Sequence, residues 1–112
     1  MDTVDIGKEF GENLINRDKQ QGDGKAGAIE FRTRYLFALD NKGVWENDDQ
    51  YIILNFQNVK RLGPSFSNEA FAYFTKYAKP ERIRRKIKFI NLDIVQESIL
   101  DLELKNGYSA YR

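Results

Sequence analysis

The sequence predicts an α/β fold, a small mixed sheet of three to five strands with about three helices packed on it. Short extended apolar runs alternate along the chain with segments whose apolar residues recur at helical spacing, which is typical of strands connected by helices. The length of 112 residues and the hydrophobic content of 41% suit a single domain, residues 1–112, with one core.

The first part of the chain predicts short elements and a loop. Residues 3–6 (TVDI) alternate and indicate a strand, GKEFG indicates a helical turn, and Leu14-Ile15 indicate a second short strand. Residues 16–27 are polar and rich in glycine, so we expect a flexible surface loop there. This loop is not a Walker A phosphate loop, because Lys19 and Ala26 stand where that motif needs a glycine and a Ser or Thr.

The next segment predicts a helix over about residues 26–39. Ile29, Leu36 and Phe37 fall on one stripe of that helix, and Gly43 lies just beyond its polar end. Trp45 follows in a loop, where an indole more often fills the edge of the core than binds a ligand.

The stretch from Tyr51 to Tyr77 predicts the centre of the fold. The nearly continuous apolar run of residues 51–59 indicates a strand buried on both faces. Gly63-Pro64 breaks this run, and Ser65 is the first residue able to cap the helix that follows. That helix has its apolar stripe at Phe66, Ala70, Phe74 and Tyr77, broadened by Phe71 and Ala78. Ser65 should therefore lie near the carboxyl end of the central strand, where open α/β sheets tend to place ligands and partners.

The last third predicts one more strand and one more helix. We expect Lys79-Pro80 to end the central helix and residues 81–86 to form a short basic connection. Residues 86–90 alternate, so Ile87 and Phe89 should face the same way. Asp93, with Gln96 three residues later, indicates a capping box for a final helix. Its apolar stripe is Val95, Ile99 and Leu102, with Leu100 and Leu104 beside it, and residues 108–112 form a tail.

Composition excludes several kinds of chemistry. The chain has no cysteine and no histidine, so disulfides, thiolate zinc sites, cysteine nucleophiles and Ser-His-Asp triads are ruled out. The net charge of +1 gives no global attraction to nucleic acid or to an anionic membrane. No apolar run approaches the ~20 residues that span a bilayer, and no signal-peptide core follows Met1. We expect a cytoplasmic protein without membrane segments, bound metal or cofactor.

The stretch LNFQNVKRLGPSFSNEAF resembles the signature of the STAS-like domain family of unknown function (DUF4325). In that signature a buried strand is followed by G-x-S-F-x-x-E-A-F. The residues that occupy its positions are Gly63, Ser65, Phe66, Glu69, Ala70 and Phe71. A second segment is similar to a D-G-x-S-G-x-x-F-R pattern of the same family. It agrees at Asp23, Gly24, Gly27, Phe31 and Arg32, whereas Ala26 replaces the serine.

More loosely, the stretch is similar to the strand-loop-helix of anti-sigma-factor antagonists, which are also STAS domains. On that alignment Ser65 matches a serine that a partner kinase phosphorylates. Gly63, Pro64 and Phe66 replace the aspartate, the first serine and the glycine of that pattern.

The resemblance implies a STAS-like fold and a non-catalytic, protein-binding function. The implied partner carries a histidine-kinase-type ATPase fold, with Ser65 as a candidate phosphoacceptor at the contact. The candidate partner-binding residues are Gly63, Pro64, Ser65, Phe66, Asn68, Glu69, Asp23 and Gly24. Other roles compete with this interpretation. The alternative for Ser65 is a helix cap alone. The alternatives for Glu69 are a carboxylate placed favourably near the start of the helix, and a carboxylate that holds a basic side chain such as Arg32.

A second class of function rests on a basic cluster. Its members are Lys79, Arg82, Arg84, Arg85, Lys86 and Lys88, and they could bind nucleic acid or phosphate. Glu81 interrupts the cluster and the whole chain is nearly neutral, so a solvated connection is the favoured interpretation. An enzyme ranks third, because Asp5, Glu9 and Asp23 are too scattered to form an acid/base pair. The sequence does not decide whether the domain forms a homodimer.

Overall fold

A computed structural model of the protein describes residues 2–18 and 27–109. The predicted loop residues Asp23 and Gly24 lie outside this part of the chain. Its elements are β1 (Asp2–Asp5), α1 (Ile6–Glu9), β2 (Asn13–Leu14), α2 (Ala28–Tyr35), η1 (Phe37–Leu39), η2 (Lys42–Glu46), β3 (Ile52–Asn55), β4 (Arg61–Leu62), α3 (Pro64–Ala70), η3 (Ala72–Lys76), α4 (Pro80–Lys86), β5 (Ile87–Ile90) and α5 (Ile94–Asn106), where η marks a 3₁₀ helix. The predicted α/β class is confirmed.

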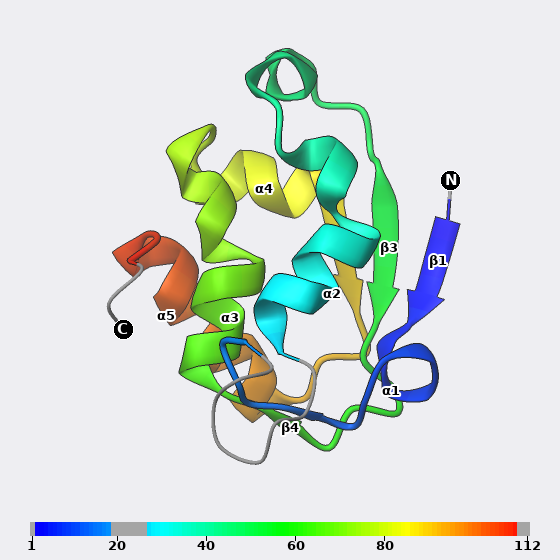
Figure 1. Ribbon diagram of the computed structural model, residues 1–112. Coiled ribbons are helices and arrows are strands. Elements are labelled where there is room, and N and C mark those ends of the chain that lie inside the picture. The colour runs from blue at the N-terminus through cyan, green and yellow to red at the C-terminus, as the bar shows by residue number, and fades with distance from the viewer. Residues whose placement is uncertain (1, 19–26, 110–112) are drawn as a thin grey trace.

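The main sheet has the strand order β1-β3-β5, and both pairings are parallel, whereas a mixed sheet was expected. The helices lie on one face of this sheet (Figure 1). Val4, Leu54 and Ile87 are buried against them. The opposite face carries the aligned row Thr3, Ile53 and Lys88, of which none is fully buried. The central strand is therefore buried on one face, and the expectation of two buried faces is wrong.

The structure also has a second, two-stranded sheet, and one of its strands, β4, lies along the chain between the central strand β3 and the helix α3. It pairs β2 with β4 in parallel, with Leu14 opposite Leu62. The chain leaves β3, turns past Gly7 and enters β4 before α3 begins. The turn lies so close to Gly7 that a Cβ there would sit 2.2 Å from the Asn58 carbonyl oxygen. Ser65 is consequently placed by β4, and not directly by the carboxyl end of β3.

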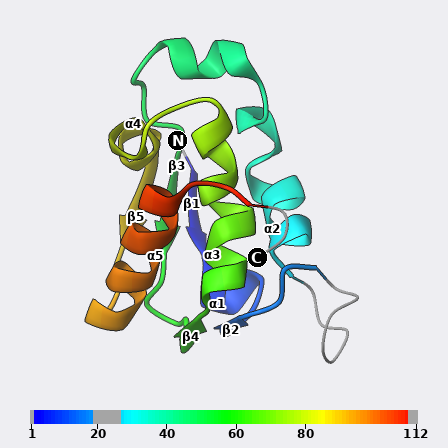
Figure 2. The ribbon, with the colours of Figure 1, turned by 90° about the vertical axis from the view of Figure 1, so that its left-hand side faces the viewer.

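The helix α3 is the centre of the helical layer, with α2 on one side and α5 on the other (Figure 2). Its residues Phe66 to Ala70 are all buried. The Phe31 ring of α2 lies 5.7 Å from the Phe66 ring and 5.9 Å from the Phe71 ring, measured between centroids. The predicted long helix is divided, because α3 ends at Ala70 and a 3₁₀ turn continues to Lys76.

Two boundaries differ from the predictions for physical reasons. The first predicted helix ends at Tyr35, and Phe37, assigned to its apolar stripe, is 73% exposed. Pro80 begins the helix α4 where a connection was expected. Proline suits the first position of a helix, because its missing N–H would have no partner there. Trp45 is buried as expected, and its Nε1–H donates to the Leu39 carbonyl oxygen at 2.8 Å.

The capping box of α5 is confirmed, but two residues of its predicted apolar stripe face the solvent. Gln96 N donates to Asp93 Oδ1 at 2.7 Å, and Asp93 N donates to Gln96 Oε1 at 3.0 Å. Val95 and Leu102, predicted to face the core, are 61% and 55% exposed. The buried side chains of this helix are Gln96, Leu100, Glu103 and Leu104. Within the described residues, no helix combines the length and apolar character needed to cross a bilayer.

Candidate functional site

Ser65 is the second residue of α3 and is half-buried. The N-cap is Gly63, which has no side chain to accept a hydrogen bond, and Pro64 occupies the first helical position. The expectation that Ser65 caps the helix is therefore wrong. The helix begins two residues earlier than a Ser65 cap would require, with Gly63 as the N-cap, because Pro64 has the backbone geometry of a first turn.

The other predicted partner-binding residues divide into surface and interior. Pro64 is exposed, and Ser65 is partly accessible beside it. Phe66, Asn68 and Glu69 are buried, so they support this surface from beneath and cannot touch a partner directly. Gly63 is also buried, and its Cβ position lies 3.4 Å from Ile15 Cδ1.

Glu69 is only 3% exposed, and its carboxylate is the centre of a buried ion network. Its Oε1 lies 2.6 Å from Arg17 Nη1, and its Oε2 lies 2.8 Å from Arg32 Nη2. The Tyr108 hydroxyl is 3.1 and 3.2 Å from the two carboxylate oxygens and donates to them. A buried carboxylate requires such compensation, because an unpaired charge is strongly unfavourable in the interior. The predicted alternative, that Glu69 holds Arg32, is confirmed.

The same network ties the end of the described chain to the helical layer. The Arg32 guanidinium lies 3.6 Å from the centre of the Tyr73 ring, and Tyr73 packs edge-on against Tyr108 at 5.0 Å. Burial, and then the negative charge of Glu69, raise the pKa of Tyr108 above its usual value. The neutral phenol is therefore the form that this site favours.

Asn68 makes a second link to the same segment. Its Nδ2 donates to Glu103 Oε1 at 3.0 Å and to the Gly107 carbonyl oxygen at 2.9 Å. Its Oδ1 accepts from Ser109 N at 2.9 Å. Residues 108–109, predicted as part of a tail, are thus bonded to α3.

Asp40 forms a half-exposed cluster at the other end of α2. The hydroxyls of Tyr73 and Tyr77 both donate to its carboxylate. Burial alone would raise the pKa of Asp40, but these hydrogen bonds, with the nearby charges of Lys76 and Arg32, outweigh it and lower the pKa. Asp40 is therefore held as the carboxylate.

Sequence reasoning missed Arg17 and Tyr108. Arg17 belongs to a polar segment predicted to be a flexible surface loop, yet its side chain is buried. Residues 16 and 17 are also fixed to α2, since their carbonyl oxygens accept from Ala28 N and Ile29 N. The usable signal was Glu69 itself, because a carboxylate inside a buried helix predicts cations next to it.

The predicted basic cluster is dispersed over several surfaces. Lys86 is buried, and its Nζ donates to Asn47 Oδ1 at 3.2 Å and to the Asp49 carbonyl oxygen at 2.9 Å. Arg84 Nη2 lies 2.7 Å from Glu97 Oε1. Lys88 is exposed on the outer face of the sheet. These three cations do not form one patch.

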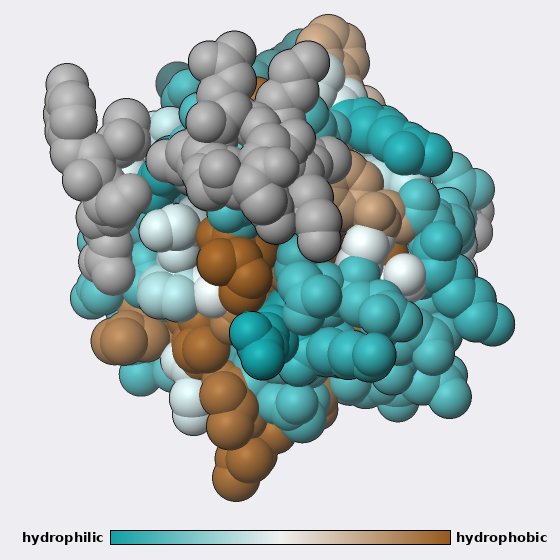
Figure 3. Space-filling model, turned by 60° about the horizontal axis from the view of Figure 1, so that its bottom comes forward, coloured by the Kyte–Doolittle hydropathy of each residue, from teal (hydrophilic) through white to brown (hydrophobic). Residues whose placement is uncertain are grey.

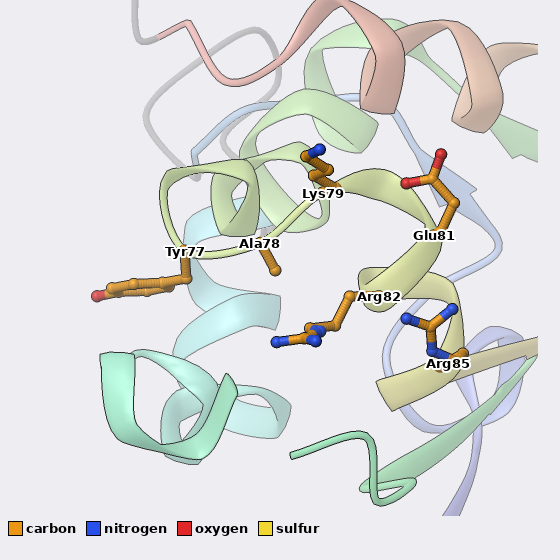
Figure 4. A pocket seen from close by; sticks show the side chains of 6 residues that line it. All are labelled: Tyr77, Ala78, Lys79, Glu81, Arg82 and Arg85. Atoms are coloured by element: carbon orange, nitrogen blue, oxygen red, sulfur yellow. The ribbon is translucent and has the colours of Figure 1, made fainter. Parts of the chain in front are cut away.

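The remaining cations, Lys79, Arg82 and Arg85, line a cavity of about 430 Å³ (Figure 4). The Arg82 side chain extends into this cavity, and Glu81 and Arg85 also line it. Arg82 Nε is 3.0 Å from Asp48 Oδ1, so this carboxylate already offsets part of the positive charge. Among the described residues, no group of three or more acidic side chains is arranged to hold a metal ion.

The comparison with protein families identifies the chain. The model of the STAS-like domain of unknown function (DUF4325) matches residues 27–95, which is more than half of the sequence and includes α2, β3, α3, α4 and β5. Neither the curated proteins nor the solved structures gave a match. On the family match, together with the α/β fold, this chain belongs to the STAS-like domain family of unknown function, DUF4325.

Proposed function

We propose that this domain is a non-catalytic protein-interaction module that contacts its partner through the start of α3. The observation that carries the proposal is the division of the predicted partner-binding residues into two groups. Phe66, Asn68 and Glu69 are locked inside the molecule, whereas Pro64 and Ser65 stand at the surface above them. A contact turn held by a packed and hydrogen-bonded support suits recognition, because little conformational freedom is lost on binding.

The surroundings of this turn also suit a protein contact. Ile15 is 44% exposed, and its side chain lies against Gly63. Figure 3 looks towards the end of the molecule that carries β2, β4 and the start of α5, and it shows a band of apolar surface between hydrophilic areas. Apolar surface of this kind is typical of protein-binding sites.

The partner that we propose carries a histidine-kinase-type ATPase fold, as the resemblance to STAS domains implies. In this proposal the partner transfers the γ-phosphoryl group of ATP to the Ser65 hydroxyl and releases ADP. The new phosphate adds about 1.5–2 negative charges close to the start of a helix, where the dipole favours them. Local folding would be kept while the contact surface changes sharply.

Affinity capture from the source cell tests this proposal. The baits are the wild type, Ser65→Ala, Ser65→Glu and, as a control on another exposed helical face, Thr33→Glu. We expect an ATPase-fold partner with the wild type, with Ser65→Ala and with the control, its loss with Ser65→Glu, and phosphate on Ser65 by mass spectrometry. Recovery of the same proteins by all four baits, with no phosphate on Ser65, would contradict the proposal.

The basic cluster supports a nucleic-acid or phosphate-binding function less well. Lys86 is used internally, and Arg82 and Arg84 lie against carboxylates. The cavity lined by Lys79, Arg82 and Arg85 is the observation that still supports a nucleic-acid or phosphate-binding function. Reversing the charge of Arg84 and Arg85 should abolish retention on nucleic acid if it is correct, and should spare partner capture if it is not.

A further inference from the structure

The helix α5 exposes a stripe of large aliphatic side chains. Ile94 is 84% exposed, Val95 61% and Leu102 55%, and Ile99 is half-buried at the edge. At 100° per residue these four positions fall within one half of the helix circumference. We call them the outer stripe.

The outer stripe is unusual because the opposite, buried face of α5 is less apolar. That face combines Leu100 and Leu104 with Gln96 and Glu103, whose polar groups are satisfied by Val59 and Asn68. A single exposed aliphatic residue needs no explanation, but a contiguous group marks a binding surface. The helix is therefore built to pack on both sides.

The outer stripe adjoins the surface proposed above. The helices α3 and α5 lie side by side and run in the same direction (Figure 2). Asn68 Nδ2 of α3 donates to Glu103 Oε1 of α5. Ser65 lies one turn before Asn68 and Ile99 one turn before Glu103, so Ile99, in the middle of the stripe, is level with the start of α3.

A row of carboxylates borders the outer stripe on one side. Asp93, Glu97 and Asp101 follow each other at intervals of four residues and are all exposed. Glu97 contacts Arg84 at 2.7 Å, and Asp101 contacts Lys105 at 3.2 Å. Such solvent-exposed ion pairs are weak and can exchange for a partner's cations.

We propose that the outer stripe is the docking site for an amphipathic helix of the partner protein, with Lys or Arg along one edge of its apolar face. An apolar stripe with charges on one edge is the complement of such a helix. A second copy of this chain fits less well, because it would bring a further row of carboxylates to the interface. The inference rests on the proposed function only in requiring a protein partner, and it does not require that Ser65 is phosphorylated.

Site-specific photo-crosslinking in the source cell tests the proposal. The full chain carries benzoylphenylalanine in place of Leu102 or, as the control, in place of Phe37 on η1, which is even more accessible. We expect the Leu102 position to crosslink to a segment of another protein whose apolar residues recur at helical spacing beside Lys or Arg. The control should not capture this segment.

Three outcomes would overturn the proposal: a crosslink to this chain itself, a crosslink to an acidic or non-helical segment, or no crosslink beyond the control. The charge row is tested separately with Asp101→Lys, which should lower the crosslinking yield roughly five-fold, whereas Glu46→Lys should not. An unchanged yield with Asp101→Lys would overturn the assigned partner chemistry. Thermal unfolding confirms that both exposed variants are folded.

The two proposals can fail independently. If Ser65→Glu abolishes partner capture while the Leu102 position crosslinks to nothing, the proposed function stands and the outer stripe is not its docking site. If the Leu102 position crosslinks to a basic amphipathic helix while the Ser65 variants behave as wild type, docking stands and the serine switch falls.

Discussion

The Arg32 guanidinium contacts Glu69 at two places, the Glu69 carboxylate and the Glu69 backbone carbonyl. Its Nη2 lies 2.8 Å from the Glu69 carboxylate, and its Nε donates to the Glu69 carbonyl oxygen at 3.1 Å. The two segments that resemble the family are thereby joined inside the protein. The part of the signature that these residues represent is structural, and it holds α2 against α3.

Replacing Glu69 should therefore destabilise the fold strongly. In Glu69→Gln, Arg17 and Arg32 keep their charges but lose the buried Glu69 carboxylate, and breaking a buried ion pair in this way costs about 3–5 kcal/mol. Urea unfolding measures the loss. The control is Asp101→Asn, which removes the exposed pair with Lys105 and should change the free energy of unfolding by about 0.5 kcal/mol or less. Equal effects for the two variants would contradict the central role of Glu69.

Alkaline pH should weaken the protein through Tyr108. Its pKa is raised in the folded state, first by burial and then by Glu69, so the stability it contributes is complete below the unfolded pKa of about 10. This stability is lost as the pH rises through the folded pKa. Tyr108→Phe should therefore show a smaller fall in the free energy of unfolding between neutral pH and pH values above about 10. Some alkaline loss should persist in the variant, because the pKa values of Tyr35 and Tyr77 are raised as well.

Gly27 should not tolerate a side chain. A Cβ at this position would lie 2.7 Å from the Asn16 carbonyl oxygen and 2.7 Å from Asp18 Cα, so Gly27→Ala has to displace the backbone that carries Arg17. We expect a loss of about 1–3 kcal/mol, the usual effect of overpacking. Gly11→Ala is the matched control, because no atom lies within 4 Å of its added Cβ. Thermal denaturation of both variants should show a clear loss only for Gly27→Ala.

Replacing Lys86 should destabilise the fold, whereas replacing Lys88 should remove only a surface charge. Lys86→Met removes two hydrogen bonds from a buried ammonium to Asn47 and Asp49, and should cost about 1.5–3 kcal/mol. Lys88→Met removes the same charge from an exposed position and should stay within about 0.5 kcal/mol of wild type. Chemical denaturation distinguishes the two. A larger loss for Lys88→Met would contradict the described roles.

The sequence predicted β1, β2, β3, β5, the start of the central helix and the α5 capping box, because each depends on residues close together in the chain. It did not predict β4, and it extended the central helix past Ala70. It placed Leu100 and Leu104 of α5 at the edge of the buried face, where they are buried, but it wrongly centred that face on Val95 and Leu102, because hydrophobicity alone assigns these two residues to the core. Gln96 and Glu103 are buried in their place, through bonds to Val59 and Asn68 that lie 37 and 35 residues away. Partners this distant leave no periodic signal.

The sequence also predicted only part of the candidate site. The resemblance located Ser65 and the pair of Arg32 with Glu69, but it placed buried side chains on the contact surface. Arg17 could not be found, since a charged residue in a glycine-rich segment is usually solvated. Pro80 was misread because proline both ends one helix and begins the next.

The position of Tyr108 affects the time at which this protein can finish folding. During synthesis, Arg17 and Arg32 emerge well before Glu69, and the hydroxyl that completes the carboxylate's hydrogen bonds follows 39 residues after it. Contacts this far apart in sequence form slowly, because a long loop must close before they form. A nascent chain that has completed α3 but not residue 108 therefore holds its central charge incompletely compensated. We expect the domain to reach its native stability only after the segment beyond α5 has left the ribosome.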